Sequence, residues 1–275
     1  MRTWLVTLSA AAWVVAASPA FPQLIMSGMS GSDGKSVTIT INMASGLGLS
    51  VITGAPYSGR QSMKSVQTLA DGTRLTRGSP SETKTYRDSM GRVRTERPAF
   101  PASAGSKPPA SFTLVEIQDP VAGYRYALDS ANHVAHRAPL QSRVVPAATA
   151  LAAVDSPSFT QKLSDGVTAT SEPLGTQVMS GVTVVGRRTT LSYPAGSRVG
   201  NDRPLSTVTE TWITPQGIVL LSKSTGLSES TTTMEDFSAA EPDPTLFLIP
   251  SDYQIVDETG PFKIVVPRAA GDGVR

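Results

Sequence analysis

The two histidines, His133 and His136, are the first residues to consider for chemistry. As His-x-x-His on a helix they could share a metal ion. Here they follow a predicted turn and lie in a strand-like run, where side chains three residues apart point to opposite faces. A metal site needs three or four converging ligands, and the surrounding sequence supplies no third. We therefore predict two separate surface or partly buried imidazoles and no metal site.

Motifs of nucleophilic and nucleotide chemistry are incomplete. A Ser-His-acid hydrolase would need one of the two histidines as its base, and the Gly-x-Ser-x-Gly elbow is absent. Ser32-Asp33-Gly34-Lys35 matches Ser-x-x-Lys but lacks the companion Lys-Thr-Gly motif. Gly46-Leu47-Gly48 begins a dinucleotide-type pattern without its third glycine. Paired carboxylates of the glycosidase type stay open, because they need no local spacing.

Aromatic residues leave two interpretations open. In a sheet they pack the core or protect a sheet end, and they can instead line a ligand site. The five in question are Tyr86, Tyr126, Tyr193, Trp212 and Phe247. We predict no catalytic, cofactor-binding or metal-binding residue, no cofactor, and a ligand-binding surface whose residues the sequence does not identify.

Charge is unevenly distributed although the formal net charge is only +2. Residues 60–97 hold nine basic and four acidic residues, and residues 228–258 hold eight acidic and no basic ones. The two stretches either neutralise each other in the fold or form an electrostatic docking face. We favour the first interpretation. Nucleic acid is not an expected partner, because the basic stretch lacks an aromatic stacking platform.

The N-terminus has the layout of a secretory signal peptide. Arg2 precedes an apolar run from Trp4 to Ala17, followed by small residues and a proline. The run is shorter than the ~20 residues a helix needs to cross a bilayer. Cleavage after Ala17 and cleavage after Ala20 both fit the pattern. We therefore expect an exported protein, periplasmic or extracellular, with no transmembrane segment once the signal is removed.

Cysteine is absent from the chain. Stability must therefore come from a packed core, without the disulfides that exported proteins often use. The absence also excludes thiol nucleophiles, thiolate zinc sites and iron–sulfur ligation. About 255 residues after signal removal are enough to bury such a core.

A period of two dominates the chain and predicts antiparallel strands. Asp71-Gly72 between two alternating runs is a strong hairpin signal, because tight turns need a positive φ. A polar turn repeats at 86–93, 126–134 and 212–219, with Gly91, Asn132 and Gly217 at the predicted left-handed position. The predicted strands are 36–42, 65–69, 73–77, 112–118, 123–128, 175–179, 182–193, 205–214, 218–224 and 228–237.

Helical spacing is scarce. The two short candidates are 147–154 and 243–247, with Pro244 at the first helical position of the second. The fold class expected is mostly β: a strongly curved antiparallel meander, a half-barrel-like sheet with little helix. We prefer one continuous sheet over two β-domains, because each half has too few strands to cover its own faces.

The predicted organisation has four parts. Residues 1–20 are a signal peptide, and residues 21–53 are a flexible lead-in with one possible strand. Residues 54–267 form a single β-domain with a mobile Ala/Pro-rich insertion at 139–167. Residues 268–275 are a flexible tail.

Turn-rich segments recur along most of residues 54–256. They are Pro56-Tyr57-Ser58, 67–74, 86–92, 118–126, 200–204, 241–247 and 250–253. As a set they resemble an uncharacterised family of exported bacterial proteins, a resemblance that implies no known activity.

The hairpin rhythm also resembles, at the level of fold, the curved half-barrels of LolA-like periplasmic lipoprotein carriers and the related RseB-like envelope-stress regulators. Those carriers close the concave face with helices, and this chain has little helix for that purpose. We expect a non-enzymatic binding protein of the cell envelope that holds a lipid, lipoprotein or envelope protein on a curved sheet. The alternative is a structural or sensory envelope component acting through protein contacts, and a hydrolytic enzyme has the least support.

Overall fold

The computed structural model describes residues 25–30, 36–43, 49–69, 71–98, 112–146, 157–163, 166–197, 199–226 and 228–267. Strand accounts for 64% of the structure and helix for 3%. The mostly β class predicted from the period of two is therefore confirmed. The predicted signal peptide, the helix candidate 147–154 and the tail 268–275 lie outside the described residues.

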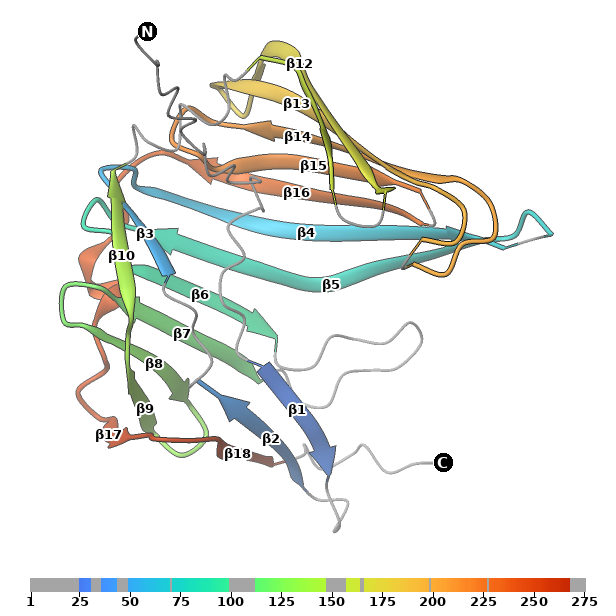
Figure 1. Cartoon of the computed structure of the whole chain (residues 1–275). Coiled ribbons are helices and arrows are strands. Elements are labelled where there is room, and N and C mark those ends of the chain that lie inside the picture. The colour runs from blue at the N-terminus through green and yellow to red at the C-terminus, as the bar shows by residue number, and fades with distance from the viewer. Residues whose placement is uncertain are drawn as a thin grey trace, which may run out of the picture.

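Thirteen strands form one curved sheet (Figure 1). In spatial order they are β11 (Phe159–Lys162), β12 (Thr168–Met179), β13 (Val182–Tyr193), β14 (Leu205–Ile213), β15 (Val219–Thr225), β16 (Glu229–Ser238), β4 (Tyr57–Thr68), β5 (Arg74–Arg87), β6 (Val93–Pro98), β7 (Thr113–Asp119), β8 (Tyr124–Asp129), β9 (Val134–Pro139) and β17 (Gln254–Asp257). Neighbours are antiparallel except β17, which runs parallel to β9. Since β11 and β17 remain edges, the sheet curves without closing into a barrel.

Two meanders make up this sheet. β4 to β9 follow one another in the front half of the chain, and β11 to β16 follow one another in the back half. β16 pairs with β4, from Glu229 opposite Val66 to Ser238 opposite Ser58. The sheet therefore runs without a break through both halves.

The β16–β4 pairing also brings the acidic and basic stretches together. Arg60 Nη2 lies 2.9 Å from Glu235 Oε2, and Arg74 Nη2 lies 3.2 Å from Glu229 Oε2. Arg92 and Arg94 pair within their own hairpin, with Asp88 and Glu96. The first of the two charge interpretations, mutual neutralisation, therefore describes these pairs.

The predicted turn glycines adopt positive φ where the hairpins need it. φ is 85° at Gly72, 83° at Gly91 and 77° at Gly217. Gly91 has a second constraint, because an added Cβ would stand 2.5 Å from Val51 Cγ1 and 3.2 Å from Ile52 O. This turn therefore packs against residues 51–53, which precede β4.

The turn at residues 126–134 differs from its prediction. The left-handed residue is His133, with φ 53°, and not Asn132. Asp129 Oδ1 accepts hydrogen bonds from the Ala131 and Asn132 N–H groups, and Asn132 Nδ2 donates to Asp129 Oδ2 at 2.7 Å. These bonds engage both the backbone and the side chain of Asn132 with Asp129, so the left-handed conformation falls on the next residue.

Two smaller sheets accompany the large one. β1 (Ile25–Ser30), β2 (Ser36–Asn42) and β18 (Phe262–Pro267) form an antiparallel sheet in the order β1-β2-β18. β3 (Leu49–Thr53) pairs in parallel with β10 (Ser142–Pro146). The lead-in 21–53 was predicted to hold one strand. That strand is β2, and the structure adds β1 and β3.

Both faces of β7, β8 and β9 are covered. On one face Leu114, Ala127 and Ala138 pack with Ile39 and Ile264 of the small sheet. On the other face a second cluster is capped by residues that precede β17; it comprises Ile117, Leu128, Ala135, Val115, Tyr126, Ile249 and Tyr253.

A 3-10 turn, η2 (Pro244–Phe247), precedes that cap. Pro244 stands in its first turn, as predicted, and the Asp243 carboxylate accepts a hydrogen bond from the Thr245 N–H at 2.9 Å. Phe247 is buried, so the turn anchors the chain before it reaches β17.

Candidate functional site

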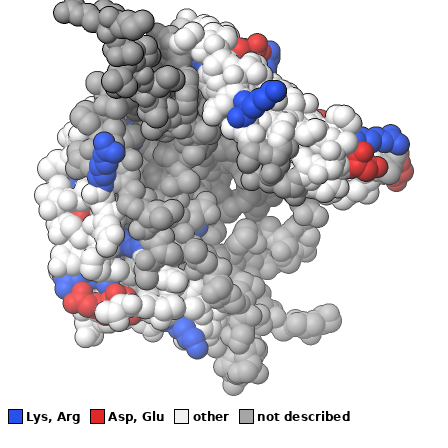
Figure 2. Space-filling view, viewed as in Figure 1, with Lys and Arg blue, Asp and Glu red and all other residues white. Residues whose placement is uncertain are grey.

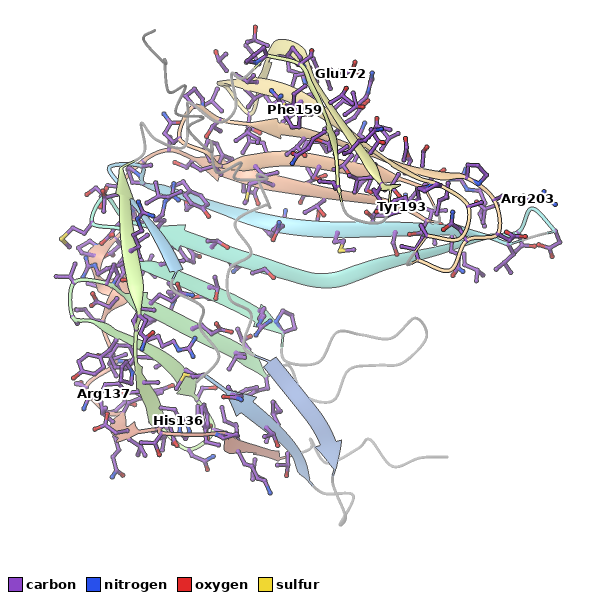
Figure 3. The ribbon with its side chains drawn as sticks, in the orientation of Figure 1. His136, Arg137, Phe159, Glu172, Tyr193 and Arg203 are labelled. Carbon is purple, nitrogen blue, oxygen red and sulfur yellow. The ribbon has the colours of Figure 1, made fainter. Side chains whose placement is uncertain are left out.

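The large sheet has an inner and an outer face. Side chains alternate along a strand, and directly opposed residues of neighbouring strands share a face. We call the face that carries Leu114 and Ala127, beneath the sheet β1-β2-β18, the inner face. In Figure 3, His136 and Phe159 lie on the inner side, whereas Arg137 and Glu172 lie along the outer side.

A row of hydroxyl side chains crosses the inner face of the upper half. Its members are directly opposed in register from β12 through β13, β14, β15 and β16 to β4. They are Ser171, Thr189, Thr209, Ser224, Ser230 and Ser65. We call this set the hydroxyl row. A parallel row one step along the strands adds Thr211, Ser222 and Thr232.

Hydrogen bonds hold parts of the hydroxyl row in place. Thr209 Oγ1 donates to Ser224 Oγ at 3.4 Å. Arg187 Nε donates to Ser171 Oγ at 2.7 Å, and Ser171 Oγ lies 3.5 Å from Thr189 Oγ1. Apart from buried Ser171 these side chains are half-buried, so they form a polar, uncharged lining.

The outer face of the same strands is charged. Arg188 on β13 lies opposite Glu172 on β12 and Glu210 on β14, and Glu210 lies opposite Lys223 on β15. Arg188 contacts the two carboxylates at 2.9 and 2.7 Å. A water-facing sheet surface commonly carries such charges. The inner face of β12 to β16 and β4 carries one charged side chain among the described residues, Arg187.

The inner face of β12 to β16 and β4 has little charge, with Arg187 as its one described charged side chain. Figure 2 shows charged side chains gathered at the tip of the long hairpins, at the right of the view, and at the lower left margin. Among the described elements none packs across the inner face of β12 to β16 in the way β1-β2-β18 covers β7 to β9. This part of the sheet is therefore a candidate binding surface.

The inner face of the lower half carries a buried charged group. Arg97 Nη2 on β6 donates to Glu116 Oε1 on β7 at 2.7 Å. Arg125 on β8 lies one step from Glu116, because Glu116 opposes Ala127 and Gln118 opposes Arg125. Glu116 and Arg125 are each 8% exposed. Burial raises the pKa of the Glu116 carboxyl, and Arg97 and Arg125 partly offset that rise.

Arg87 on β5 is a second buried cation on this face, with 6% exposure. Its Nε donates to Ala55 O at 2.8 Å, and its guanidinium lies 4.7 Å from the centroid of the Tyr57 ring. Burial lowers the pKa of Arg87 and raises the pKa of Tyr57 to about 12, and the charge of Arg87 opposes the rise at Tyr57. Arg87 thus binds a carbonyl and a ring face.

The two histidines contact different carboxylates. His133 Nδ1 lies 2.7 Å from Asp252 Oδ2 at the surface, and His136 Nδ1 lies 2.7 Å from Glu258 Oε1. His136 is buried and stacks on Phe262 at 4.0 Å between centroids. The predicted separation of the two imidazoles is confirmed. Within the described part of the chain, no three acidic or histidine side chains converge to hold a metal ion.

His136 and Glu258 resemble the histidine and the acid of a Ser-His-acid triad. Glu258 holds Nδ1, while Nε2 is buried and has no hydrogen-bond partner. A hydrolytic role would need a hydroxyl within reach of Nε2. No described side chain fills that role, so the pair alone orients the ring.

The five aromatics mostly serve packing. Tyr86, Tyr126 and Trp212 stand on the outer face by register, and Trp212 lies against Gly186. Phe247 is buried in η2, and only Tyr193 belongs to the inner face. The structure thus supports the packing interpretation for Tyr126, Trp212 and Phe247.

Sequence reasoning missed the inner arginines and the hydroxyl row. One signal was available at two positions: Arg125 and Glu116 alternate with apolar residues inside strands whose other face is also apolar. When one face of a strand is apolar and a charged residue interrupts the apolar residues of the other face, that charged residue is expected to be buried. The Ser32-to-Lys35 and Gly46-to-Gly48 motifs lie outside the described residues, and no helix among the described ones is long and apolar enough to span a bilayer.

No protein-family model and no curated protein matches the chain. Similar solved structures include LprF from Mycobacterium bovis, with a TM-score of 0.30 and 12% identity over 72% of this chain and 90% of that one. A putative outer membrane lipoprotein-sorting protein domain from Vibrio parahaemolyticus matches with a TM-score of 0.23 and 8% identity, over 70% and 89%. A DUF1329 family protein from Desulfovibrio piger matches with a TM-score of 0.17 and 9% identity, over 71% and 90%.

A putative outer membrane lipoprotein-sorting protein domain thus stands among the solved structures that are similar to this chain.

Proposed function

We propose that this is an exported binding protein of the cell envelope that holds a lipid, or the lipid part of a lipoprotein, against the inner face of its curved sheet. The observation that carries the proposal is the nearly uncharged inner face of β12 to β16 and β4, where Arg187 is the one described charged side chain. No described element covers this face, while the outer face of the same strands carries alternating charges.

The chemistry of this lining supports an amphipathic ligand. Threonine presents a methyl group beside its hydroxyl, so the hydroxyl row offers both apolar contact and hydrogen bonds. An apolar cluster lies on the same strands, with Leu220, Met234 and Tyr57 buried and Phe237 stacked on Tyr57 at 6.2 Å. Trp212, on the outer face by register, also packs against this cluster. Ligand sites combine such apolar walls with a few polar groups that set orientation.

A component that acts through charged protein contacts has less support. That alternative relied on the basic stretch 60–97 and the acidic stretch 228–258 as docking surfaces. Arg60 and Arg74 of the basic stretch instead pair with three carboxylates of the acidic stretch, Glu229, Glu235 and Asp236. A binding role also needs no catalytic group, in keeping with the prediction of a non-enzymatic protein.

The test uses two adjacent threonines that point to opposite faces. Thr189 lies in the hydroxyl row, and Thr190 lies on the outer face opposite Val208. Both are half-buried in β13. We would titrate the neutral apolar dye N-phenyl-1-naphthylamine into the purified exported protein and follow its fluorescence.

Thr189→Phe should weaken dye binding by about tenfold or more, since a ring in the lining removes contact area worth ~1.4 kcal/mol. Thr190→Phe should bind as the wild type does. Equal binding by both variants, or no dye binding by the wild type, would refute the proposal.

A further inference from the structure

The described charges of the inner face are strongly biased toward arginine. By register, four guanidinium groups and one carboxylate belong to the inner side of the strands. They are Arg87, Arg97, Arg125, Arg187 and Glu116. Asp129 is set apart, because it caps the turn that ends β8. A concave surface lined by one sign of charge concentrates ligands of the opposite sign.

Three of these arginines retain nitrogen atoms without a partner. They are buried Arg87 Nη2, Arg97 Nε and Arg125 Nε. Arg87 and Arg125 are more than nine-tenths buried, at 6% and 8% exposure. Buried polar groups in proteins are normally hydrogen-bonded, and a buried cation is normally paired. These donors therefore point to an acceptor that the described part of the chain does not supply.

Arg87 and Arg125 lie in one row that crosses the strands of the sheet. Arg87, Val93, Gln118 and Arg125 oppose one another in a single transverse row across β5, β6, β7 and β8. Three strand spacings of ~4.8 Å place the backbones of Arg87 and Arg125 about 14 Å apart. Arg87 stands at the end of this row next to β4, opposite Tyr57, and the hydroxyl row reaches the same strand eight residues further along, at Ser65, ~26 Å away.

The choice of arginine indicates the kind of anion. A guanidinium presents a planar fork of donors that matches phosphate or carboxylate oxygens two at a time, and it stays charged when buried. Lysine is absent from the described inner face, whereas the outer face carries Lys64, Lys84 and Lys223 beside its carboxylates.

We propose that the ligand has an anionic, phosphate-type head that is bound by Arg87, with Arg97 and Arg125 extending the positive surface, while its apolar part lies along the hydroxyl row. This inference rests on the proposed lipid-binding function and adds the headgroup class to it.

The test compares headgroups on the wild-type protein. Exported protein is mixed with vesicles of phosphatidylcholine doped with either phosphatidylglycerol or diacylglycerol, the vesicles are removed, and protein-bound lipid is quantified by mass spectrometry. The expected result is a preference of about tenfold for the phosphate-bearing, anionic lipid. Equal capture of both lipids would overturn the anion site while leaving lipid binding intact.

Variants then locate the site. Arg87→Gln and Arg125→Gln should each reduce the preference for phosphatidylglycerol severalfold without reducing capture of diacylglycerol. Arg188→Gln is the matched control, because that arginine lies on the outer face between Glu172 and Glu210. Arg87→Lys keeps the charge and checks folding by circular dichroism. Preference retained in both glutamine variants would refute the assignment.

If neither lipid is captured, the proposed function fails and the arginines are tested alone. Inorganic phosphate should then raise the Tm of the wild type and not that of Arg87→Gln. Such a result would assign the site to a free phosphate-type anion. No rise in Tm would overturn the site altogether.

Discussion

Arg97 Nη2 and Glu116 Oε1 form an ion pair at 2.7 Å beneath the small sheet, with the arginine side chain 19% and the glutamate side chain 11% exposed. Desolvation dominates at this site, because the pKa of Glu116 is raised despite two neighbouring arginines. The ionised carboxyl is therefore tolerated only through Arg97 and Arg125, and the two partners should respond differently to mutation.

Arg97→Gln should lower the free energy of unfolding by about 3 kcal/mol at pH 7.5, because it leaves a buried carboxylate with one partner fewer. Glu116→Gln should cost less, since its amide oxygen can still accept from Arg97 and a neutral side chain avoids the burial cost that raises the pKa of Glu116. Urea denaturation of both single variants and the double variant tests this asymmetry. Equal losses for the two single variants would contradict it.

The pH dependence of the same pair follows from the direction of the shift. A carboxyl whose pKa is raised in the fold contributes stability that is fully present below its unfolded pKa and is lost as pH rises through the folded pKa. The wild type should therefore lose stability relative to Glu116→Gln as pH increases from 4 upward. A difference that stays constant with pH would show that Glu116 does not titrate abnormally.

Tyr57 should make the stability of the protein depend on pH in the alkaline range. Its pKa is raised from 10.0 to about 12 by burial, so its contribution is present below pH 10 and is lost between pH 10 and about 12. Two pKa units correspond to about 3 kcal/mol. Tyr57→Phe should remove that part of the alkaline loss in urea denaturation curves. Tyr126 and Tyr253, whose pKa values are also raised, remain in both proteins and cancel in the comparison.

Much of the local structure could be predicted because it depends on neighbours in the sequence. The alternation at 36–42 and 182–193 matches the bounds of β2 and β13. Glycine chemistry placed the turns at Gly72 and Gly91. The turn at 129–133 shows the limit, since the hydrogen bonds of Asp129 shift the left-handed residue from Asn132 to His133.

Long-range relations could not be predicted in this way. The pairing of β16 with β4 joins residues more than 160 positions apart, and nothing local selects it. Alternation also shows which residues share a face without showing which face lies inside. For that reason Arg87, which follows Lys84 and Thr85, looks like a solvent-facing strand residue in the sequence. The hydroxyl row emerges only once five strand registers are combined.

Substitutions at two turn glycines distinguish the cost of backbone strain from the cost of a steric clash. Gly72 and Gly91 have nearly the same φ, 85° and 83°, but only Gly91 has neighbours in the space of a Cβ. Gly72→Ala should cost about 1 kcal/mol, the usual penalty for a left-handed alanine. Gly91→Ala should cost at least ~2 kcal/mol, because Ile52 O is backbone and cannot move aside easily. Similar losses in thermal denaturation would mean that the turn is not seated on β3.

Two turn aspartates make a second matched pair. Asp88 is 1% exposed and accepts hydrogen bonds from the backbone and guanidinium of Arg92, whereas exposed Asp71 accepts one from the Thr73 N–H. Asp88→Ala should cost about 3 to 5 kcal/mol, since it leaves Arg92 without its carboxylate. Asp71→Ala should cost about 1 kcal/mol or less. Chemical denaturation of both variants measures the difference, and equal costs would refute the structural role given to Asp88.

The central claim is that the inner face, lined by the hydroxyl row, holds a lipid. Native mass spectrometry of the protein purified from its exported form tests it most directly. The account predicts a bound lipid on the wild type and on Thr190→Phe, and its loss or marked reduction on Thr189→Phe. Wild-type protein without any bound lipid, or equal occupancy of the two variants, would contradict it.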